Sequence, residues 1–403
     1  MNYSLLKNKK VLLCVSSGIA IYKAIDLCSR FRKNGVDLTV LMTKDAEKLV
    51  SKTVFQAVGK CKVYTDIYEL EGGWIPHTDL SLEADVLIVA PATSNTIAKI
   101  TVGISDNLVT AACLAFNKKE RIIVPTMNIR MYENEITQSN IDTLKKRGWF
   151  VMEPEEGHLA CGEVGKGRYP ENENILDFIE YAISKKDFKG KKVLITAGPT
   201  IEEIDPVRYI SNYSSGKMGY EIAREFSKRG ADVSLVSGNT HLKLPYMVKD
   251  FVEVKSTENM FEAVIERVKE MDIIVLSAAV SDFVPVNIES KKIKKDKKED
   301  FDLKLKKNTD IAFEISKIKK DNQIVVGFAA ETNDLIVNAK NKLNKKKFDI
   351  IVANDVSRKD IGFSSDFNEI NVITKEDEYN FEKSSKKVIS SNICDFISSY
   401  LDK

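Results

Sequence analysis

The chain has 403 residues, of which 43% are hydrophobic, enough to form packed cores in about two to four domains. Lys and Arg number 61 against 59 Asp and Glu, and a formal charge of +2 excludes a whole-molecule basic field for nucleic acid or an anionic membrane. No apolar run approaches the ~20 residues of a membrane span, so we expect a cytoplasmic protein. The six cysteines include no CxxC pair, so neither a disulfide framework nor a structural zinc site is indicated.

Apolar runs alternate with helical spacing along the first half of the chain. Predicted strands cover residues 11–15, 37–42, 86–90 and 121–124, and predicted helices cover 19–33, 95–100 and 136–147. Buried strands that alternate with helices are typical of a parallel, doubly wound sheet.

The same pattern restarts after the polar stretch 184–190. Predicted strands cover residues 192–196, 232–236, 273–277 and 350–353, and a helix is predicted at 219–229. The segment KKVLLCVSSG near residue 10 is similar to KKVLITAGPT near residue 192. We interpret this similarity as shared architecture, with internal duplication as the alternative. The sequence therefore predicts an α/β protein with two doubly wound, Rossmann-like domains in series, residues 1–188 and 189–403.

Small and hydroxyl-bearing residues follow two strands of the first half. Ser16, Ser17 and Gly18 precede a helix N-terminus, where backbone N–H groups favour a phosphate. Residues 90–96 form a second such turn, and 103–108 a third polar loop. In open α/β sheets ligands bind beyond the carboxyl ends of the strands, so these loops indicate a pocket for a phosphate and a ring, although ordinary tight turns would look the same. The GxGxxG fingerprint is absent, which disfavours NAD.

A histidine and a cysteine are the other candidates in this half. His77 stands alone in a polar segment, where a histidine is more often structural than catalytic. Cys161 lies in a segment with four glycines between residues 157 and 167, which indicates a mobile flap. A thiol on such a flap is poorly explained by core packing. His158 and Cys161 lack a second ligand pair, so a metal site is not indicated.

The order of these motifs resembles a known family. It is carried by SSGIAIYK, His77, APATSNTIAK, GISDNLVT, PTMNIRMY and ACGEVGKGR. The first half is thereby similar to the flavin-dependent cysteine decarboxylases, phosphopantothenoylcysteine decarboxylase in particular. Two positions depart from the family: Ser17 stands where many members have Gly, and Tyr132 where many have Trp.

The resemblance implies a flavodoxin-like flavoprotein domain that decarboxylates 4'-phosphopantothenoylcysteine. His77 would assist oxidation of the substrate thiol, Asn128 would hold the substrate carboxylate, and Cys161 would donate a proton to the enethiol. The residues implied to bind FMN are Ser16, Ser17, Gly18, Thr43, Thr93, Asn95, Ser105, Asp106, Asn107, Leu108 and Met131.

Two features of the second half indicate anion binding. Residues 205–219 gather an arginine, an amide, hydroxyls and glycines just before a helix, although Met218 after Gly216-Lys217 excludes a Walker A loop. Residues 291–307 carry nine lysines. They form either a solvated loop or a flap that closes over polyphosphate, and the lysines of residues 340–347 admit the same alternatives.

The motifs DPVRYISNYSSGKMG, AAVSDF, KKIKK, KNTDI, GFAAET and AND resemble the phosphopantothenate–cysteine ligase domain. This resemblance implies that a carboxylate of 4'-phosphopantothenate attacks the α-phosphate of CTP and that L-cysteine then attacks the acyl cytidylate. Asn212 would hold the acyl intermediate and Arg208 the phosphopantothenate, with Mg²⁺ on the triphosphate. The residues implied to contact CTP are Asp282, Lys292, Asn308, Thr309, Asp310, Ile311, Phe328, Lys342 and Lys346, with Lys292 also acting in catalysis.

Together the two resemblances cover nearly the whole chain and match, in domain order, a bifunctional bacterial family of coenzyme A synthesis. They imply a homo-oligomer with trimers of the flavin domain and dimers of the ligase domain, which combine in a dodecamer. A non-catalytic flavin- or nucleotide-binding regulator is the alternative, and a nicotinamide oxidoreductase is disfavoured by the missing glycine fingerprints. The sequence does not identify the Mg²⁺ ligands.

Overall fold

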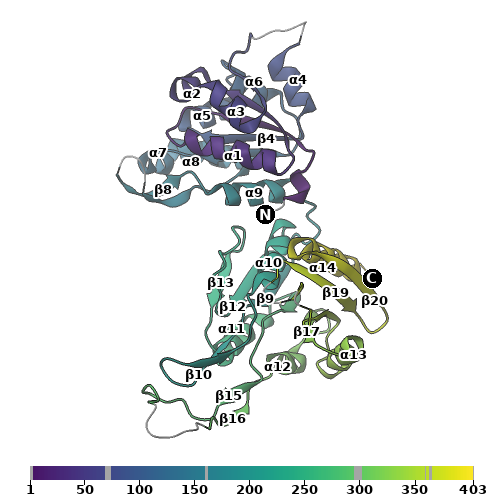
Figure 1. The fold of residues 1–403 in the computed structure, drawn as a ribbon. Coiled ribbons are helices and arrows are strands. Elements are labelled where there is room, and N and C mark those ends of the chain that lie inside the picture. The colour runs from purple at the N-terminus through teal and green to yellow at the C-terminus, as the bar shows by residue number, and fades with distance from the viewer. Residues whose placement is uncertain are drawn as a thin grey trace. The chain divides into compact units, whose positions relative to one another are not determined.

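The protein consists of two compact units in a computed structural model that describes residues 3–68, 74–158, 162–294, 302–358, 360–362 and 365–402 (Figure 1). The units are Met1–Ser184 and Lys185–Lys403. They divide just before residues 188/189, where the sequence predicted the boundary. Each unit is built on its own sheet.

The first unit contains a six-stranded parallel sheet in the order β3-β2-β1-β4-β5-β6. Its strands are β1 (Lys10–Val15), β2 (Asp37–Met42), β3 (Lys62–Tyr64), β4 (Val86–Ala92), β5 (Arg121–Pro125) and β6 (Phe150–Val151). The predicted parallel, doubly wound sheet is confirmed. The order is that of Rossmann sheets and refines the comparison with flavodoxin, because the chain continues outward from β2 to β3 before it crosses back to β4.

Helices pack on this sheet through apolar stripes. Its helices are η1 (Ser4–Leu6), α1 (Ile21–Lys33), α2 (Lys44–Leu49), α3 (Lys52–Gly59), α4 (Pro76–Glu83), α5 (Ser94–Val102), α6 (Leu108–Ala115), α7 (Ile129–Glu133), α8 (Glu135–Lys146) and α9 (Asn172–Ile183). One core joins the strands to α5, α6 and α8 through residues such as Leu87, Val109 and Ile141. An antiparallel hairpin, β7 (Glu155–His158) and β8 (Val164–Arg168), precedes α9.

The second unit contains an eight-stranded sheet in the order β13-β12-β9-β14-β17-β18-β19-β20. Its strands are β9 (Lys192–Ala197), β12 (Asp232–Ser237), β13 (Asp250–Glu253), β14 (Ile273–Leu276), β17 (Ile324–Glu331), β18 (Ile350–Asp355), β19 (Phe367–Ile373) and β20 (Glu378–Ser385). The first six pair in parallel and follow the same Rossmann order as the first unit, whereas β19 and β20 extend the sheet in antiparallel fashion. Two short ribbons, β10 (Ile201–Glu203) with β11 (Tyr209–Ser211) and β15 (Phe283–Pro285) with β16 (Leu305–Lys307), lie outside this sheet.

Two apolar cores cover the two faces of this larger sheet. Its helices are α10 (Lys217–Lys228), α11 (Thr257–Val268), α12 (Ile311–Ile318), α13 (Leu335–Lys345) and α14 (Lys386–Leu401). The core with α10 and α14 includes Phe226 and Ile393, and the core with α11, α12 and α13 includes Val264 and Ile315. Among the helices described, none has the length and apolarity needed to cross a bilayer.

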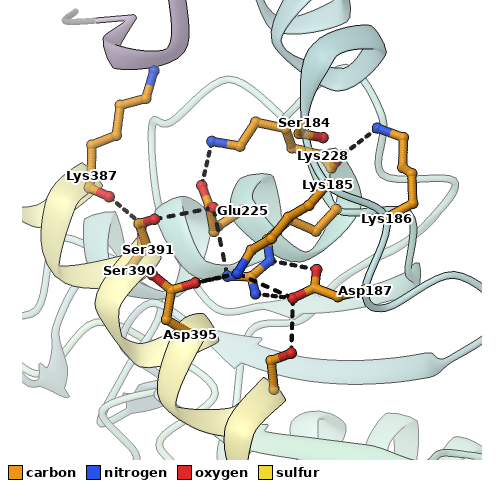
Figure 2. Close-up of polar contacts among 12 residues, drawn as sticks. Ser184, Lys185, Lys186, Asp187, Glu225, Lys228, Lys387, Ser390, Ser391 and Asp395 are labelled. Atoms are coloured by element: carbon orange, nitrogen blue, oxygen red, sulfur yellow. Dashed lines mark hydrogen bonds and ion pairs between the residues drawn. The ribbon is translucent and has the colours of Figure 1, made fainter.

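A buried arginine, Arg229 at the end of α10, connects the start of the second unit to α14 through Asp187 and Asp395, both labelled in Figure 2. Arg229 is 1% exposed, and its Nε donates to Asp187 Oδ1 at 2.8 Å while its Nη2 donates to the other oxygen of that carboxylate. Its Nη1 donates to Asp395 Oδ1 at 2.9 Å. The guanidinium also lies over the Phe188 ring, 4.8 Å from the centroid. These contacts explain why residues 185–188 belong to the second unit.

Candidate active sites

A cavity of about 510 Å³ lies at the carboxyl ends of three neighbouring strands of the first unit. Ser17 and Gly18 follow β1, residues 93–95 follow β4, and Asn128 follows β5. This is the point where the strand order reverses, at which Rossmann sheets bind their ligands. The complete lining is Ser17, Gly18, Ile19, Ala20, Tyr22, Lys23, Thr93, Ser94, Asn95, Thr126, Met127, Asn128, Met131, His158, Gly167, Arg168 and Tyr169. Five residues predicted to bind FMN, Ser17, Gly18, Thr93, Asn95 and Met131, are therefore brought together here with Asn128.

Ser16, at the end of β1, is hydrogen-bonded to the turn after β4 that lines this cavity. Its side chain is buried, and its Oγ donates to the carbonyl oxygen of Pro91 at 2.8 Å and accepts from the N–H of Thr93 at 3.1 Å. Thr93 in turn caps α5, accepting from the N–H of Thr96. The hydroxyl of Ser16 thus fixes the turn after β4 relative to the end of β1.

The other residues predicted to bind FMN lie in helix-capping loops. The Thr43 side chain accepts from the N–H of Ala46 at the start of α2, and the Asn107 side chain accepts from the N–H of Thr110 at the start of α6. Asp106 forms an ion pair with Lys99, Ser105 is exposed and Leu108 is in the core. Among the described residues, none of these five belongs to the cavity lining.

His77 lies in the first turn of α4 and is half-buried. Its Nδ1 is buried and has no hydrogen-bond partner among the described residues. The histidine is not part of the cavity lining that the structure describes for this chain.

The hairpin β7–β8 packs closely on the loop that carries Asn128. The Asn128 Oδ1 accepts from the N–H of Arg130 at 2.8 Å, and its Nδ2 donates to Glu163 Oε2 at 3.0 Å. Glu163 lies just before β8, and His158 at the end of β7 lines the cavity. Cys161, the predicted proton donor, lies outside the described residues.

Two cavities lie at the carboxyl edge of the second sheet. The smaller, of about 270 Å³, contains Asn212 and the turn before α10. Its full lining is Asn212, Ser214, Ser215, Gly216, Lys217, Met218, Gly219, Ser277, Ala278, Ala279, Val280, Asp282, Phe328, Ala330, Lys342, Asn354, Gly362, Asn368 and Lys386. The Asn212 Nδ2 donates to the carbonyl oxygen of Ala279 at 3.0 Å.

Three lysines, Lys217, Lys342 and Lys386, give the smaller cavity its positive charge. Lys386 begins α14, is 5% exposed and donates to the carbonyl oxygen of Gly362 at 2.7 Å. Burial, together with the charge of Lys217, lowers the pKa of Lys386 to about 8. The α10 N-terminus adds backbone N–H groups to the same space, so the cavity is suited to an anion.

The larger cavity, of about 430 Å³, gathers nearly all residues predicted to bind CTP. Those in its lining are Asp282, Asn308, Thr309, Asp310, Ile311, Phe328, Lys342 and Lys346. Lys346 pairs with Asp310, the residue that caps α12, and Lys342 donates to the carbonyl oxygen of Phe328 at 2.7 Å. Burial lowers the pKa of the Lys342 amine.

The two cavities of the second unit share a wall. Asp282, Phe328 and Lys342 line both of them, together with Ala278 and Val280. The two cavities are therefore adjacent, and Lys342 contributes to both.

Arg208 and Lys292 lie apart from both cavities as far as the described residues define them. The Arg208 Nη2 donates to the carbonyl oxygen of Ile293 at 3.2 Å, and the N–H of Ile293 donates to Asp205 Oδ2 at 3.1 Å. Burial alone would raise the pKa of Asp205, but the N–H groups of Val207, Ile293 and Arg208 lower it below its usual value. This turn anchors the start of the lysine-rich segment, residues 291–307, while Lys292 itself is exposed.

Sequence reasoning missed several cavity residues. Lys386 and Asn368 belong to no motif and come from the antiparallel end of the sheet, whereas Asn354 lies in the AND motif at the end of β18 but was not assigned to a site. Of the lysines in residues 340–347, Lys342 and Lys346 line a cavity, whereas Lys340 pairs with Glu378. Within the described part of the chain, no three His, Cys, Asp or Glu side chains gather as metal ligands.

The protein is thus a two-unit α/β protein in which cavities lie at the carboxyl ends of the parallel strands of both units. Residues 2–184 match the Flavoprotein family, and residues 188–401 match the DNA/pantothenate metabolism flavoprotein C-terminal domain. The chain is 43% identical to the Coenzyme A biosynthesis bifunctional protein CoaBC of Bacillus subtilis (strain 168) over 376 residues, 92% of each chain. It is 40% identical to the CoaBC protein of Vibrio vulnificus (strain CMCP6), over 96% of this chain and 97% of the relative, and 37% identical to that of Escherichia coli (strain K12), over 99% and 98%.

The chain therefore belongs to the family of coenzyme A biosynthesis bifunctional proteins. The predicted family and its bifunctional character are confirmed. The alternative of a non-catalytic regulator is not favoured, because relatives that span almost the whole chain are biosynthetic proteins.

Proposed function

We propose that the first unit decarboxylates 4'-phosphopantothenoylcysteine and that the second unit makes this compound from 4'-phosphopantothenate, L-cysteine and CTP. Membership of the bifunctional family supports both activities. The observation that carries the assignment of ligation to the second unit is the wall shared by its two cavities, because ligation requires a nucleotide and an acid to meet.

The residues around the first unit's cavity fit FMN. Ser17, Gly18 and the α1 N-terminus offer small groups and N–H donors to a phosphate, and the residues after β4 add hydroxyls and an amide. Bound FMN would supply the two-electron oxidation of the substrate thiol and its later reversal. Ser16 would keep the two turns in register through its bonds to Pro91 and Thr93.

Residues of the chain would direct the substrate and its protons. The Asn128 amide would donate to the substrate carboxylate and orient the bond that breaks. His77 would accept the proton of the substrate thiol, and the Cys161 thiol would donate a proton to carbon after CO₂ has left.

A second copy of the chain would supply His77. The histidine is outside the described cavity lining of its own chain, while Ile19 and Tyr22 in that lining are 72% and 62% exposed. Large apolar side chains at a cavity rim favour cover by another subunit. This arrangement agrees with a trimer of first units, and paired second units would extend the assembly to a dodecamer.

Ligation would place CTP in the larger cavity and the acid in the smaller one. The carboxylate of 4'-phosphopantothenate attacks the α-phosphate beside Lys342, pyrophosphate leaves, and the amine of cysteine then attacks the acyl cytidylate, releasing CMP. Lys342 and Lys346 would stabilise charge on the phosphates, Mg²⁺ would accompany the triphosphate, and Asn212 would hold the acyl group. Lys292, which precedes the residue that Arg208 contacts, would bind a phosphate of CTP.

The cytoplasm, which supplies CTP and keeps thiols reduced, is the compartment that this function requires. Cys14, Cys28, Cys61, Cys113 and Cys394 are free thiols in the structure, in agreement with a reducing location.

The test is to supply the protein with 4'-phosphopantothenate, cysteine, CTP and Mg²⁺ and to follow pyrophosphate and CO₂. Asn212→Asp should lower the rate of pyrophosphate release at least about tenfold while CO₂ is still formed from added 4'-phosphopantothenoylcysteine. Asn128→Asp should do the reverse, because a carboxylate repels the substrate carboxylate. Loss of both products in either variant would contradict the assignment of one activity to each unit.

A further inference from the structure

A carboxylate of the chain itself lies where the substrate carboxylate would bind. The Asn128 Nδ2 donates to Glu163 Oε2 at 3.0 Å, and the Arg130 Nη2 donates to Glu163 Oε1 at 2.5 Å. Each oxygen of one carboxylate is thus held by a different residue of the loop after β5. Arg130 was not singled out by the sequence, because its position lies between the motif residues Asn128 and Met131.

The hairpin is built so that Glu163 reaches this position. Gly165 and Gly167 of β8 face the loop after β5, and Glu163, the residue before β8, reaches the same loop through the hydrogen bond from Asn128. A Cβ at Gly165 would lie 2.0 Å from the Ile129 Cδ1, and a Cβ at Gly167 would lie 2.2 Å from the carbonyl oxygen of Met127. The missing side chains therefore let the strand approach the loop closely enough for the carboxylate of Glu163 to reach Asn128.

We propose that Asn128 and Arg130 form a two-residue carboxylate clamp and that Glu163 occupies it until the substrate carboxylate displaces it. The inference rests on the proposed function, which assigns the substrate carboxylate to Asn128. Arg130 becomes a specificity-determining residue, since it distinguishes a ligand with a carboxylate from one without. Glu163 becomes an internal competitor, because between turnovers its carboxylate accepts the hydrogen bonds of Asn128 and Arg130.

The exposure of the pair makes displacement feasible. The Arg130 side chain is 83% exposed and the Glu163 side chain 32% exposed, so water screens their attraction. Ion pairs of this kind shift an equilibrium by about two- to fivefold. A substrate that is anchored elsewhere in the cavity can therefore replace Glu163 at small cost, and removing Glu163 should tighten binding by a similar factor.

The experiment compares two ligands of the flavin-loaded, full-length protein by calorimetry. The first is 4'-phosphopantothenoylserine, which keeps the carboxylate but has a hydroxyl that is not oxidised like the thiol. The second is the matching ethanolamine amide, which lacks the carboxylate. Glu163→Gln and Glu163→Ala should each tighten binding of the serine ligand about two- to fivefold and leave the ethanolamine ligand unchanged. Glu156→Gln is the matched control, because it removes the same charge from an exposed position of the same hairpin.

Arg130 is tested in the Glu163→Gln background, where the competitor is already weakened. Arg130→Gln should then weaken binding of the serine ligand about fivefold and leave the ethanolamine ligand unchanged. If the wild-type protein does not bind the serine ligand, the proposed function and the clamp both fail. If it binds but the Glu163 variants bind no more tightly than Glu156→Gln, the competitor role alone is overturned.

Discussion

Replacing Arg229 by methionine should destabilise the second unit far more than removing an exposed arginine. Methionine keeps most of the side-chain volume but leaves Asp187 without two charged donors and removes the cation from the Phe188 ring. Breaking a buried ion pair costs about 3–5 kcal/mol. Asp395 is 52% exposed and regains water, so we expect a value near the lower end, about 3 kcal/mol. For a unit of this size, that corresponds to a fall in melting temperature of roughly 6–12 °C.

The matched control is Arg358→Met. Arg358 also pairs with two carboxylates, those of Asp360 and Glu369, but its side chain is 41% exposed. Water screens exposed pairs of this kind, so Arg358→Met should lower the melting temperature far less than Arg229→Met. Calorimetry would follow the unfolding of the second unit. Tryptophan fluorescence would follow the unfolding of the first unit, because both tryptophans, Trp74 and Trp149, lie in the first unit. Equal displacement of the calorimetric transition by the two variants would refute the reasoning.

The effect of Arg229→Met also depends on pH in a defined direction. Burial alone would raise the pKa of Asp187, but hydrogen bonds from Arg229 and Ser398 and the charge of Arg229 lower it well below its usual range. A carboxyl with a depressed pKa in the folded state stabilises the fold fully above its unfolded pKa of about 4 and loses this contribution as pH falls below it. The difference in unfolding free energy between wild type and variant should therefore be constant near neutrality and shrink below about pH 4.

Three further changes test the sites. Asn212→Asp should lower the rate of pyrophosphate release at least about tenfold, because a carboxylate there repels the acyl phosphate, and unchanged release would remove Asn212 from the site. Binding of 4'-phosphopantothenate, measured by calorimetry, should weaken as pH rises through about 8, where Lys386 loses its proton, and Lys386→Gln should lack this step. Gly167→Ala should lower CO₂ release without affecting ligation, because a Cβ would meet the Met127 carbonyl oxygen at 2.2 Å and φ is +144°. Normal decarboxylation by that variant would contradict the close packing of the hairpin on the loop.

The central strands could be predicted from the sequence because they are buried on both faces. Residues 86–90 and 122–125 are continuous apolar runs, and β4 and β5 contain them. The hairpin β7–β8 could not be recognised in this way, because its face toward the loop at Asn128 is made of glycines rather than apolar side chains. The three-residue strand β3 is too short to show any period, and this is why the strand order was not available from the sequence.

The predictions for the sites depended on motifs rather than on periodicity. Eight of the residues predicted to contact CTP line one cavity, although they come from segments as far apart as Asp282 and Lys346. His77 shows the limit of this approach, since the motif names the residue but the cavity lining described for its own chain does not include it. Lys386 shows the complementary limit, because it lies in no motif and its place in a cavity depends on the pairing of two distant strands.

The antiparallel end of the second sheet explains how one strand order serves two different chemistries. Both units have the same strand order, in which the direction of strand addition reverses beside the first strand. Both have a cavity at that point. In the second unit the parallel strands all end at one edge of the sheet. β19 begins at this edge and β20 ends there, because Phe367 at the start of β19 pairs with Ser385 at the end of β20. The chain therefore returns to the ligand-binding edge twice more, bringing Asn368 and Lys386 to the smaller cavity. This added wall is the part of the second unit that has no counterpart among the described strands of the first, and under the proposed function it makes room for an acid beside a nucleotide.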